Sequence, residues 1–445
     1  MKVVVLVDGE HYPSVTRWAI DELRAGGLEP LAALFVGGGE KLDPSSALDL
    51  GVPLRGSGSS EAPIAPAVGD AIDELHPEAI FDLSDEPVLG YRERMEIAAV
   101  ALARGVPYLG PDFRFDPPIE EPPLPVPTIA VIGTGKRTGK TAVSGEAARV
   151  AAALGLEPIV VAMGRGGPAE PEVARAGTVT LDVLLGLVRA GRHAASDYLE
   201  IAATSGVTTV GARRAGGGVA GRPAFTNVRA AAELAVGLGA RILIVDGSGA
   251  SVPTFPWDAG VLVVPSTVPP EYLGGYLGPF RLLLSDLVVV TMASSPAGLQ
   301  NIPALRSHVE RLNADARLIV TDFEPQPLGD VRGRDVFFTT TAPGAVAAKQ
   351  AETLARTHGC RVVGWSAKLA DRAGLAQDLD GAEAYEVLLS ELKAAAIDVA
   401  CDRAMSRGAE VVFVDNRAVV SEGDMDLPTA LRETIGLAGE RSRQR

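Results

Sequence analysis

The sequence contains little cysteine, histidine or lysine, and each shortage narrows the functions to consider. Cys360 and Cys401 are the only cysteines in 445 residues, and no Cys-x-x-Cys pair occurs. We therefore expect neither a disulfide framework nor a structural zinc site. The five histidines are scattered singly, so no histidine cluster indicates a metal centre. Lysine occurs only seven times, against thirty-four arginines, so two lysines close together are conspicuous.

Long apolar runs and an excess of positive charge are also missing. No stretch reaches the ~18 consecutive apolar residues that a membrane-spanning helix requires. The apolar run Val3–Val7 ends at Asp8 after five residues, shorter than the ~7–15 of a secretory signal, so we predict a buried first strand and a cytoplasmic protein. A formal net charge of −15 argues against nucleic acid or an anionic membrane as the partner. An anionic substrate would therefore need a local cluster of arginines.

The most informative segment is a glycine-rich loop at residues 133–141, Gly-Thr-Gly-Lys-Arg-Thr-Gly-Lys-Thr. An apolar run precedes it and good helix formers follow it, and this strand, loop and helix order predicts a phosphate-binding P-loop. Its backbone N–H groups and the helix N-terminus attract phosphate oxygens. Lys140 is expected to span the β and γ phosphates of ATP, and Thr141 to bind Mg²⁺. The alternative is an ordinary glycine-rich turn with a solvated lysine. The predicted nucleotide-binding residues are Gly133, Thr134, Gly135, Lys136, Arg137, Thr138, Gly139, Lys140 and Thr141.

The spacing within this loop departs from the commonest P-loop form. Five residues separate Gly133 from Gly139, as in the loop that this segment resembles, that of dethiobiotin synthetase and its relatives. Some ATPases of that class use a second lysine five positions before the first. Gly135 occupies that position here, and Lys136 follows it. Lys136 is therefore a candidate for a second phosphate contact.

Residues 1–110 have the pattern of a Rossmann-like parallel α/β domain. Apolar strands are predicted at 3–7, 30–36, 78–83 and 106–109, with helices at 16–25, 66–75 and 93–103 between them. Polar loops follow three of the strands, at 8–11, 37–40 and 82–86. Because ligands of open α/β sheets bind at the carboxyl ends of strands, Asp8 and Glu10 are candidate substrate-binding residues. The alternative is that such acidic residues cap the following helices.

A proline-rich segment at 111–127 separates this domain from the rest of the chain. Its seven prolines exclude a helix or a central strand, so we predict a stiff linker. The P-loop NTPase α/β domain is predicted at 128–342 and a C-terminal α/β extension at 343–438. Residues 439–445 are predicted to be a polar, disordered tail.

Arginines recur in glycine-rich segments of the P-loop domain. Arg165 follows a predicted strand at 156–162, and residues 211–222 combine five glycines with three arginines, including Arg213 and Arg214. A mobile loop with several arginines suits a substrate that carries several phosphates. Charged or disordered surface loops are the alternatives.

Asp246 ends an apolar strand at 241–246. P-loop proteins place a Mg²⁺-binding carboxylate at such a position, so we predict that Asp246 binds the metal, with a helix cap as the alternative. Later strands end in turns at 291–295, 321–322 and 339–341, and one of these turns is expected to hold the nucleotide base. The polar groups Glu391-Leu-Lys393 and Asp415-Asn416-Arg417 lie near strand and helix ends and have no assigned role at this point.

Taken together, these features resemble the cyclic 2,3-diphosphoglycerate synthetase family. The resemblance rests on the P-loop, on the start Val7-Asp-Gly-Glu10, and on two patches, Glu391-Leu-Lys-Ala-Ala-Ala396 and Val414-Asp-Asn416. It implies ATP, Mg²⁺ and 2,3-bisphosphoglycerate as ligands, and a homodimer. It also implies a ligase reaction that joins the two phosphates of one molecule, with release of ADP and phosphate. A phosphate oxygen is already a nucleophile, so this chemistry needs positioned cations more than a tuned base. The proposed catalytic residues are Lys140, Lys136, Arg137 and Arg165.

Two other functions stay open at this stage. One is a nucleotide switch or metal-delivery GTPase of the same P-loop class, although the Cys-x-Cys or histidine-rich tract usual in metal chaperones is missing. The other is a ligase like dethiobiotin synthetase, including the amidotransferase type. Its glutaminase variants need a nucleophilic cysteine in a tight turn between small residues, and Cys360 lacks that setting.

Overall fold

The structure is a computed structural model that describes residues 1–39, 41, 49–56 and 63–445. By their internal contacts these residues divide into two compact units. Unit 1 comprises Met1–Glu120, Pro269–Ser285 and Pro303–Asp315, and unit 2 comprises Glu121–Val268, Asp286–Ile302 and Ala316–Arg445. None of the helices in the described ranges combines the length and the apolarity that crossing a bilayer requires.

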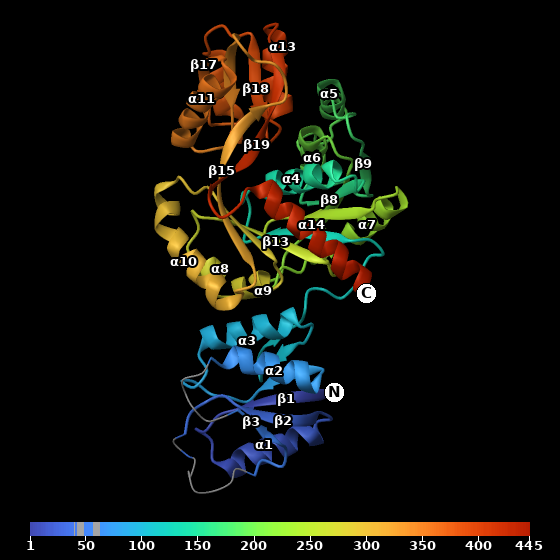
Figure 1. The fold of residues 1–445 in the computed structure, drawn as a ribbon, viewed down its shortest axis with the longest axis vertical. Coiled ribbons are helices and arrows are strands. Elements are labelled where there is room, and N and C mark those ends of the chain that lie inside the picture. The colour runs from blue at the N-terminus through green and yellow to red at the C-terminus, as the bar shows by residue number, and fades with distance from the viewer. Residues whose placement is uncertain (40, 42–48, 57–62) are drawn as a thin grey trace. The chain divides into compact units, whose positions relative to one another are not determined.

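Unit 1 is built on a sheet with the strand order β3-β2-β1-β4-β5-β6, parallel except for the last pair (Figure 1). Its strands are β1 (Lys2–Val7), β2 (Glu29–Phe35), β3 (Leu54–Arg55), β4 (Ala79–Asp82), β5 (Tyr108–Leu109) and β6 (Arg114–Phe115). Its helices are α1 (Pro13–Ala25), α2 (Ile64–Leu75), α3 (Tyr91–Ala103), α8 (Glu271–Gly274) and α9 (Gly278–Leu283). Helix α10 (Pro296–Leu312) contributes residues to both units. The predicted parallel α/β fold is confirmed, and the apolar run at the N-terminus is a buried strand.

Unit 2 contains one large sheet, for which the described residues give thirteen strands. The order is β11-β10-β8-β12-β7-β13-β14-β15-β19-β18-β16-β17, and β9 pairs with β10. The P-loop half contains β7 (Thr128–Gly133), β8 (Pro158–Gly164), β9 (Glu172–Ala174), β10 (Thr209–Ala215), β11 (Phe225–Thr226), β12 (Ile242–Asp246), β13 (Ala259–Pro265), β14 (Leu287–Thr291) and β15 (Arg317–Pro327). The C-terminal half contains β16 (Asp335–Thr339), β17 (Arg361–Ser366), β18 (Val387–Glu391) and β19 (Glu410–Glu422).

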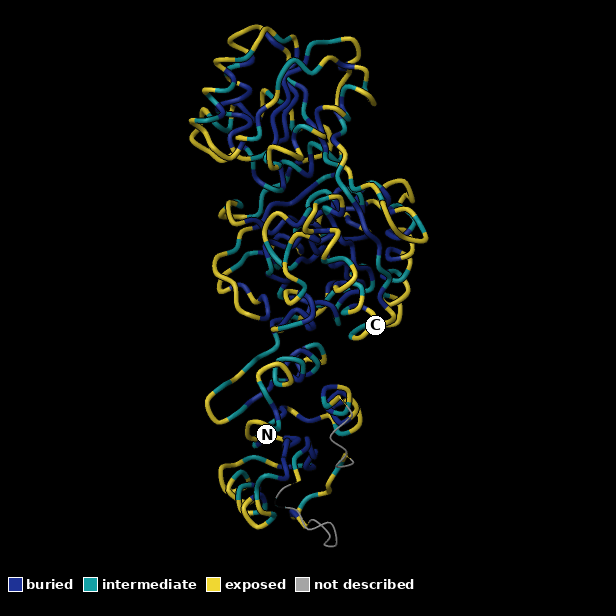
Figure 2. Tube along the Cα trace, turned by 90° about the vertical axis from the view of Figure 1, so that its left-hand side faces the viewer, coloured by how far each residue is buried: buried dark blue, intermediate teal, exposed yellow. Residues whose placement is uncertain are grey.

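Helices cover both faces of the P-loop half of this sheet, and its strands are buried along most of their length (Figure 2). The helices of unit 2 are α4 (Lys140–Ala153), α5 (Leu181–Arg189), α6 (Asp197–Ser205), α7 (Val228–Gly237), α11 (Gly344–His358), α12 (Arg372–Asp380), the π-helix η1 (Ala396–Cys401), α13 (Asp402–Ser406) and α14 (Leu427–Gln444). The side chains of successive strand residues point to opposite faces of the sheet. Val160 packs in the cluster with α4, α6 and α14, whereas Val161 packs in the cluster with α7.

The antiparallel pair β15 and β19 joins the two halves of the sheet. Both strands are long, and β19 also pairs in parallel with β18. The P-loop half and the C-terminal half therefore share one continuous backbone ladder, and residues from both can line one cavity.

The end of the chain is helical. Residues 439–444, predicted to be a polar tail, are the last residues of α14. The reason is local anchoring: Ala438 is buried, Arg441 forms an ion pair with Asp286, and Arg445 forms one with Asp258.

Candidate active site

The P-loop has the backbone that its sequence predicts. It connects β7 to α4, and Gly139, with φ 95°, precedes the first residue of the helix. A Cβ atom at Gly139 would lie 2.2 Å from the ring of Phe323, so only glycine fits. Arg137 also has a left-handed backbone, with φ 61°, which is uncommon for a residue with a side chain. Backbone strain of this kind concentrates at ligand-binding sites.

Lys140 and Asp246 lie at the centre of the site, both with little exposure to solvent. The Lys140 Nζ donates hydrogen bonds to the carbonyl of Gly135 (2.8 Å) and the hydroxyl of Thr138 (3.2 Å). Asp246 ends β12, next to the P-loop strand, and its carboxylate accepts a 2.9 Å hydrogen bond from Ser144. Burial lowers the pKa of Lys140 to about 8, although the negative charge of Asp246 acts in the opposite direction. Burial and the negative charge of Asp197 raise the pKa of Asp246 to about 7. Desolvated charges of this kind are typical of functional sites.

A cavity of about 1040 Å³ opens in front of the P-loop and lies wholly within unit 2. Four of the seven lysines of the chain line it, together with three arginines. The cationic lining residues are Lys136, Arg137, Lys140, Arg165, Lys349, Arg356 and Lys393, and the acidic ones are Asp197, Glu200, Asp246, Asp322, Glu324 and Glu391. Seven cations facing six acids give a site without the negative excess of the whole chain, as anionic ligands require.

The arginines predicted to bind substrate are only partly brought together. Arg165 lines the cavity at the end of β8, whereas in the described chain neither Arg213 nor Arg214 belongs to the cavity wall. Arg213 and Arg214 are residues of strand β10, not of a mobile loop, because that strand continues in register with β8 as far as Arg213. The prediction that these two arginines lie on a mobile loop is therefore wrong.

Arg214 and Arg165 nevertheless converge. A Cβ atom added to Gly249 would lie 2.9 Å from a guanidinium nitrogen of each. Burial, and then the positive charge of Arg165, lower the pKa of Arg214. The Arg214 Nε is buried without a hydrogen-bond partner. Two cations held together in this way are typical of an anion site. Both arginines are also held by backbone carbonyls: Arg214 donates through its terminal nitrogens to Gly216 and Ser248, and Arg213 through its Nε to Gly167 and Pro168.

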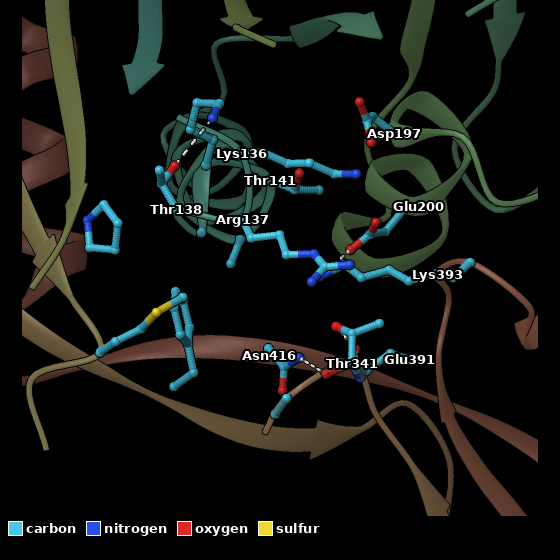
Figure 3. A pocket seen from close by; sticks show the side chains of 18 of the residues that line it. Lys136, Arg137, Thr138, Thr141, Asp197, Glu200, Thr341, Glu391, Lys393 and Asn416 are labelled. Atoms are coloured by element: carbon cyan, nitrogen blue, oxygen red, sulfur yellow. Dashed lines mark hydrogen bonds and ion pairs between the residues drawn. The ribbon is translucent and has the colours of Figure 1, made fainter. Parts of the chain in front are cut away.

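Residues not assigned from the sequence complete the cavity. Asp197 and Glu200 lie on α6, and Thr341, Glu391, Lys393 and Asn416 come from the C-terminal half of the sheet. Figure 3 shows Lys136 and Arg137 extending toward α6, where Asp197 and Glu200 lie. Acidic residues are common near the start of a helix, so the sequence of α6 does not distinguish Asp197 and Glu200 as residues of a site. Glu391-Leu-Lys393 and Asn416 contribute to the family resemblance in the sequence, but the sequence assigns them no role.

Asp8 and Glu10 belong to unit 1. One oxygen of the buried Asp8 carboxylate accepts hydrogen bonds from the backbone N–H groups of Glu10 and His11 and contacts the His11 ring. Its other oxygen accepts from the N–H of Asp85. These contacts hold the loop after β1 and do not cap α1, which begins at Pro13 after Tyr12 and has no side-chain cap, so the capping alternative is wrong for Asp8. Of the predicted loop at 37–40, Glu40 lies outside the described residues.

The oxygen donors around the P-loop suit Mg²⁺. The hydroxyl of Thr141 and the carboxylate of Asp246 are hard ligands, and Mg²⁺ typically uses one or two such protein ligands beside substrate phosphates. Among the described residues no group of three or more His, Cys, Asp or Glu side chains forms a metal cage.

Comparisons with known proteins place the chain in one family. Three models described as cyclic 2,3-diphosphoglycerate synthetase domains match it: the N-terminal domain at residues 2–116, the P-loop domain at 128–322 and the C-terminal domain at 327–417. The cyclic 2,3-diphosphoglycerate synthetase of Rubrobacter xylanophilus is 46% identical over 94% of this chain and 94% of its own length. That of Methanothermobacter thermautotrophicus is 41% identical over 95% of this chain and 93% of its own. The chain therefore belongs to the cyclic 2,3-diphosphoglycerate synthetase family.

Proposed function

We propose that this chain uses ATP to close a phosphoanhydride between the two phosphates of 2,3-bisphosphoglycerate, giving cyclic 2,3-diphosphoglycerate, ADP and phosphate. The observation that carries this proposal is the P-loop cavity, where seven cationic side chains offset six acidic ones in a chain with a net charge of −15. Membership in the family supports the choice of substrate and product.

The proposed reaction has two phosphoryl transfers. An oxygen of one substrate phosphate attacks the γ phosphorus of ATP, and the bond to the β–γ bridging oxygen breaks to release ADP. The second substrate phosphate then attacks the inner phosphorus of the new diphosphate, and the terminal phosphate leaves. Catalysis of this kind depends on positioning and on compensation of negative charge.

The residues have distinct proposed roles. Lys140 and the backbone N–H groups of the loop 133–141 bind the β and γ phosphates of ATP. Thr141 and Asp246 hold Mg²⁺, which when bound neutralises charge on the transferring phosphoryl group. Lys136, Arg137 and Arg165 line the cavity where the substrate phosphates would lie.

Several expectations remain proposals with less support. Substrate contacts from Arg213, Asp8 and Glu10 rest on the sequence pattern alone. The homodimer rests on the family resemblance, and the cytoplasmic location on the composition of the chain and the character of its first strand.

Purified protein should turn over ATP slowly by itself and much faster with 2,3-bisphosphoglycerate. The reason is that the substrate phosphate is the nucleophile, and water replaces it poorly. Phosphorus NMR should show a phosphoanhydride signal that appears together with ADP and phosphate. A nucleotide switch would ignore the small molecule and respond to a protein partner, and a ligase of the dethiobiotin synthetase type would respond to a different acid. A lack of stimulation by 2,3-bisphosphoglycerate would therefore count against the proposed function.

Arg214→Ala should raise the KM for 2,3-bisphosphoglycerate roughly 10- to 150-fold, because a lost charge-assisted contact is worth about 1.5–3 kcal/mol. Arg213→Ala should have a smaller effect, because it is Arg214 whose guanidinium converges with that of Arg165 at Gly249. ATP binding, measured by calorimetry without substrate, should change little in either variant. Loss of ATP binding in Arg214→Ala would instead assign this arginine to the nucleotide.

A further inference from the structure

The turn after β18 carries a lysine into the P-loop cavity. Glu391 ends the strand, and Lys393 and Ala394 both line the cavity. On either side of them Leu392 and Ala395 are buried, so packing fixes the turn. Ala394 has a left-handed backbone, with φ 48°, a conformation that costs an alanine free energy. Strain at a residue that lines a cavity is a sign of function when the surrounding structure maintains it.

Lys393 stays charged and partly open to the cavity. Its Nζ lies 3.2 Å from the carboxylate of Glu200, and its side chain is 36% exposed against 12% for Glu200. Burial disfavours the ammonium form, but the carboxylates of Glu200 and Glu391 outweigh burial and raise the pKa of Lys393. Burial raises the pKa of Glu200 to about 7 despite the opposing charge of Lys393. Lys393 therefore lines the cavity as a partly exposed, charged side chain.

Lys393 belongs to the same cavity as the P-loop residues. It lines the cavity together with Lys136 and Lys140. In Figure 3 Lys393 lies beside Glu200 and reaches the cavity from the side that the P-loop residues Lys136 and Arg137 point toward. The P-loop already supplies Lys140 and its N–H groups for the nucleotide. A cation on the facing wall is placed for the other anionic reactant.

A purely structural ion pair explains these observations less well. Four hydrogen bonds from Thr340, Thr341 and Asn416 satisfy the carboxylate of Glu391, and Lys393 favours its ionised form through its charge. Glu200 does not need a cationic partner either, because protonation of its carboxylate would remove the negative charge. The lysine brings a positive charge, on a side chain that is 36% exposed, to a cavity that must accept many negative charges.

We infer that Lys393 is a catalytic residue that binds a phosphate of the bisphosphorylated substrate, and that Glu200 positions its ammonium group. The inference rests on the proposed function. When the substrate enters, the Lys393 Nζ exchanges part of its contact with Glu200 for a phosphate oxygen. The lysine then offsets negative charge as the two phosphates approach each other.

The test compares Lys393→Met, Lys393→Arg, Glu200→Gln and the double variant Lys393→Met with Glu200→Gln, using Lys368→Met as the matched control. Lys368 pairs with Asp378 and does not line the cavity. Steady-state assays vary 2,3-bisphosphoglycerate, and calorimetry measures binding of ATP with Mg²⁺ in its absence. Lys393→Met should raise KM and lower kcat by at least tenfold each, and leave ATP binding within twofold. Lys393→Arg should recover part of both losses.

The double variant keeps the test valid if Lys393→Met folds poorly, because it leaves no unpaired acid at position 200. If Glu200 acts through Lys393, Glu200→Gln impairs the wild type but adds no further loss to Lys393→Met. An additive loss would overturn the positioning role. Unchanged KM and kcat in Lys393→Met, with a substrate-stimulated wild type, would overturn this inference and leave the proposed function standing. Lost ATP binding with unchanged KM would also overturn it. A wild type that 2,3-bisphosphoglycerate does not stimulate would overturn the proposed function and this inference with it.

Discussion

Replacing Lys140 with alanine should lower the rate of ATP turnover by at least about a hundredfold. This side chain is the one cation that the P-loop fold aims at the β and γ phosphates, and loss of one preorganised contact of this kind costs about 2.7–4 kcal/mol. The residue is 7% exposed and its Nζ is fixed by the Gly135 carbonyl and the Thr138 hydroxyl. Little conformational freedom is therefore lost when it binds phosphate. The measurement is kcat for ADP release at saturating ATP and substrate.

Two other lysine variants make that result interpretable. Lys368→Ala removes a lysine from outside the cavity and should leave turnover unchanged, because exposed ion pairs contribute little. Lys136→Ala removes a cavity lysine from the same loop and should cost less than Lys140→Ala, since Lys136 does not occupy the signature-lysine position. Retention of more than about a tenth of the activity in Lys140→Ala would contradict the role of this loop.

The P-loop could be predicted because its chemistry is local. Nine consecutive residues hold the glycines, the lysine and the hydroxyl, and the backbone itself supplies the phosphate donors. Asp246 was predictable for a related reason: it ends a strongly apolar strand, and the carboxyl ends of parallel strands meet at one edge of the sheet.

The other half of the cavity could not be predicted in the same way. Glu200 and Lys393 are 3.2 Å apart in space but far apart in sequence, and the pairing of β15 with β19 joins their halves of the sheet. The local setting of each residue is ordinary and does not indicate a site. Glu200 lies in the first turn of a helix, and Lys393 lies in a turn after a strand. A single sequence contains no signal for a contact between such groups.

The arginine segment shows how composition can mislead. Five glycines in residues 211–222 suggest a mobile loop, but the first part of the segment is strand β10. Neighbouring strands β8 and β9 supply hydrogen bonds that override the low strand propensity of glycine. A strand directs successive side chains to opposite faces, which separates Arg213 from Arg214.

Glu391 is the shared acceptor of a hydrogen-bond network that forms the C-terminal wall of the cavity. Its replacement with alanine should be the most destabilising change considered. The carboxylate accepts hydrogen bonds from the Thr340 hydroxyl (2.7 Å), the Thr341 N–H (2.9 Å) and hydroxyl (2.8 Å), and the Asn416 amide (2.6 Å). It thereby connects the ends of β16 and β18 to β19. Removing a buried charge whose partners stay behind costs about 3–5 kcal/mol in unfolding free energy.

Urea denaturation should show this loss of unfolding free energy in Glu391→Ala at neutral pH. The difference between the variant and the wild type should become smaller in acid. Burial opposes ionisation of Glu391, but Lys393 and the hydrogen bonds outweigh burial and lower its pKa. A lowered pKa contributes stability above about pH 4.3, the ordinary value for glutamate, and that contribution disappears as the pH falls through the lowered value. The wild type should therefore approach the variant in stability below about pH 4. Glu410→Ala is the matched control, because this exposed glutamate on β19 pairs with Arg334 and should cost at most about 1 kcal/mol. Equal losses in the two variants would show that the Glu391 network does not hold the wall together.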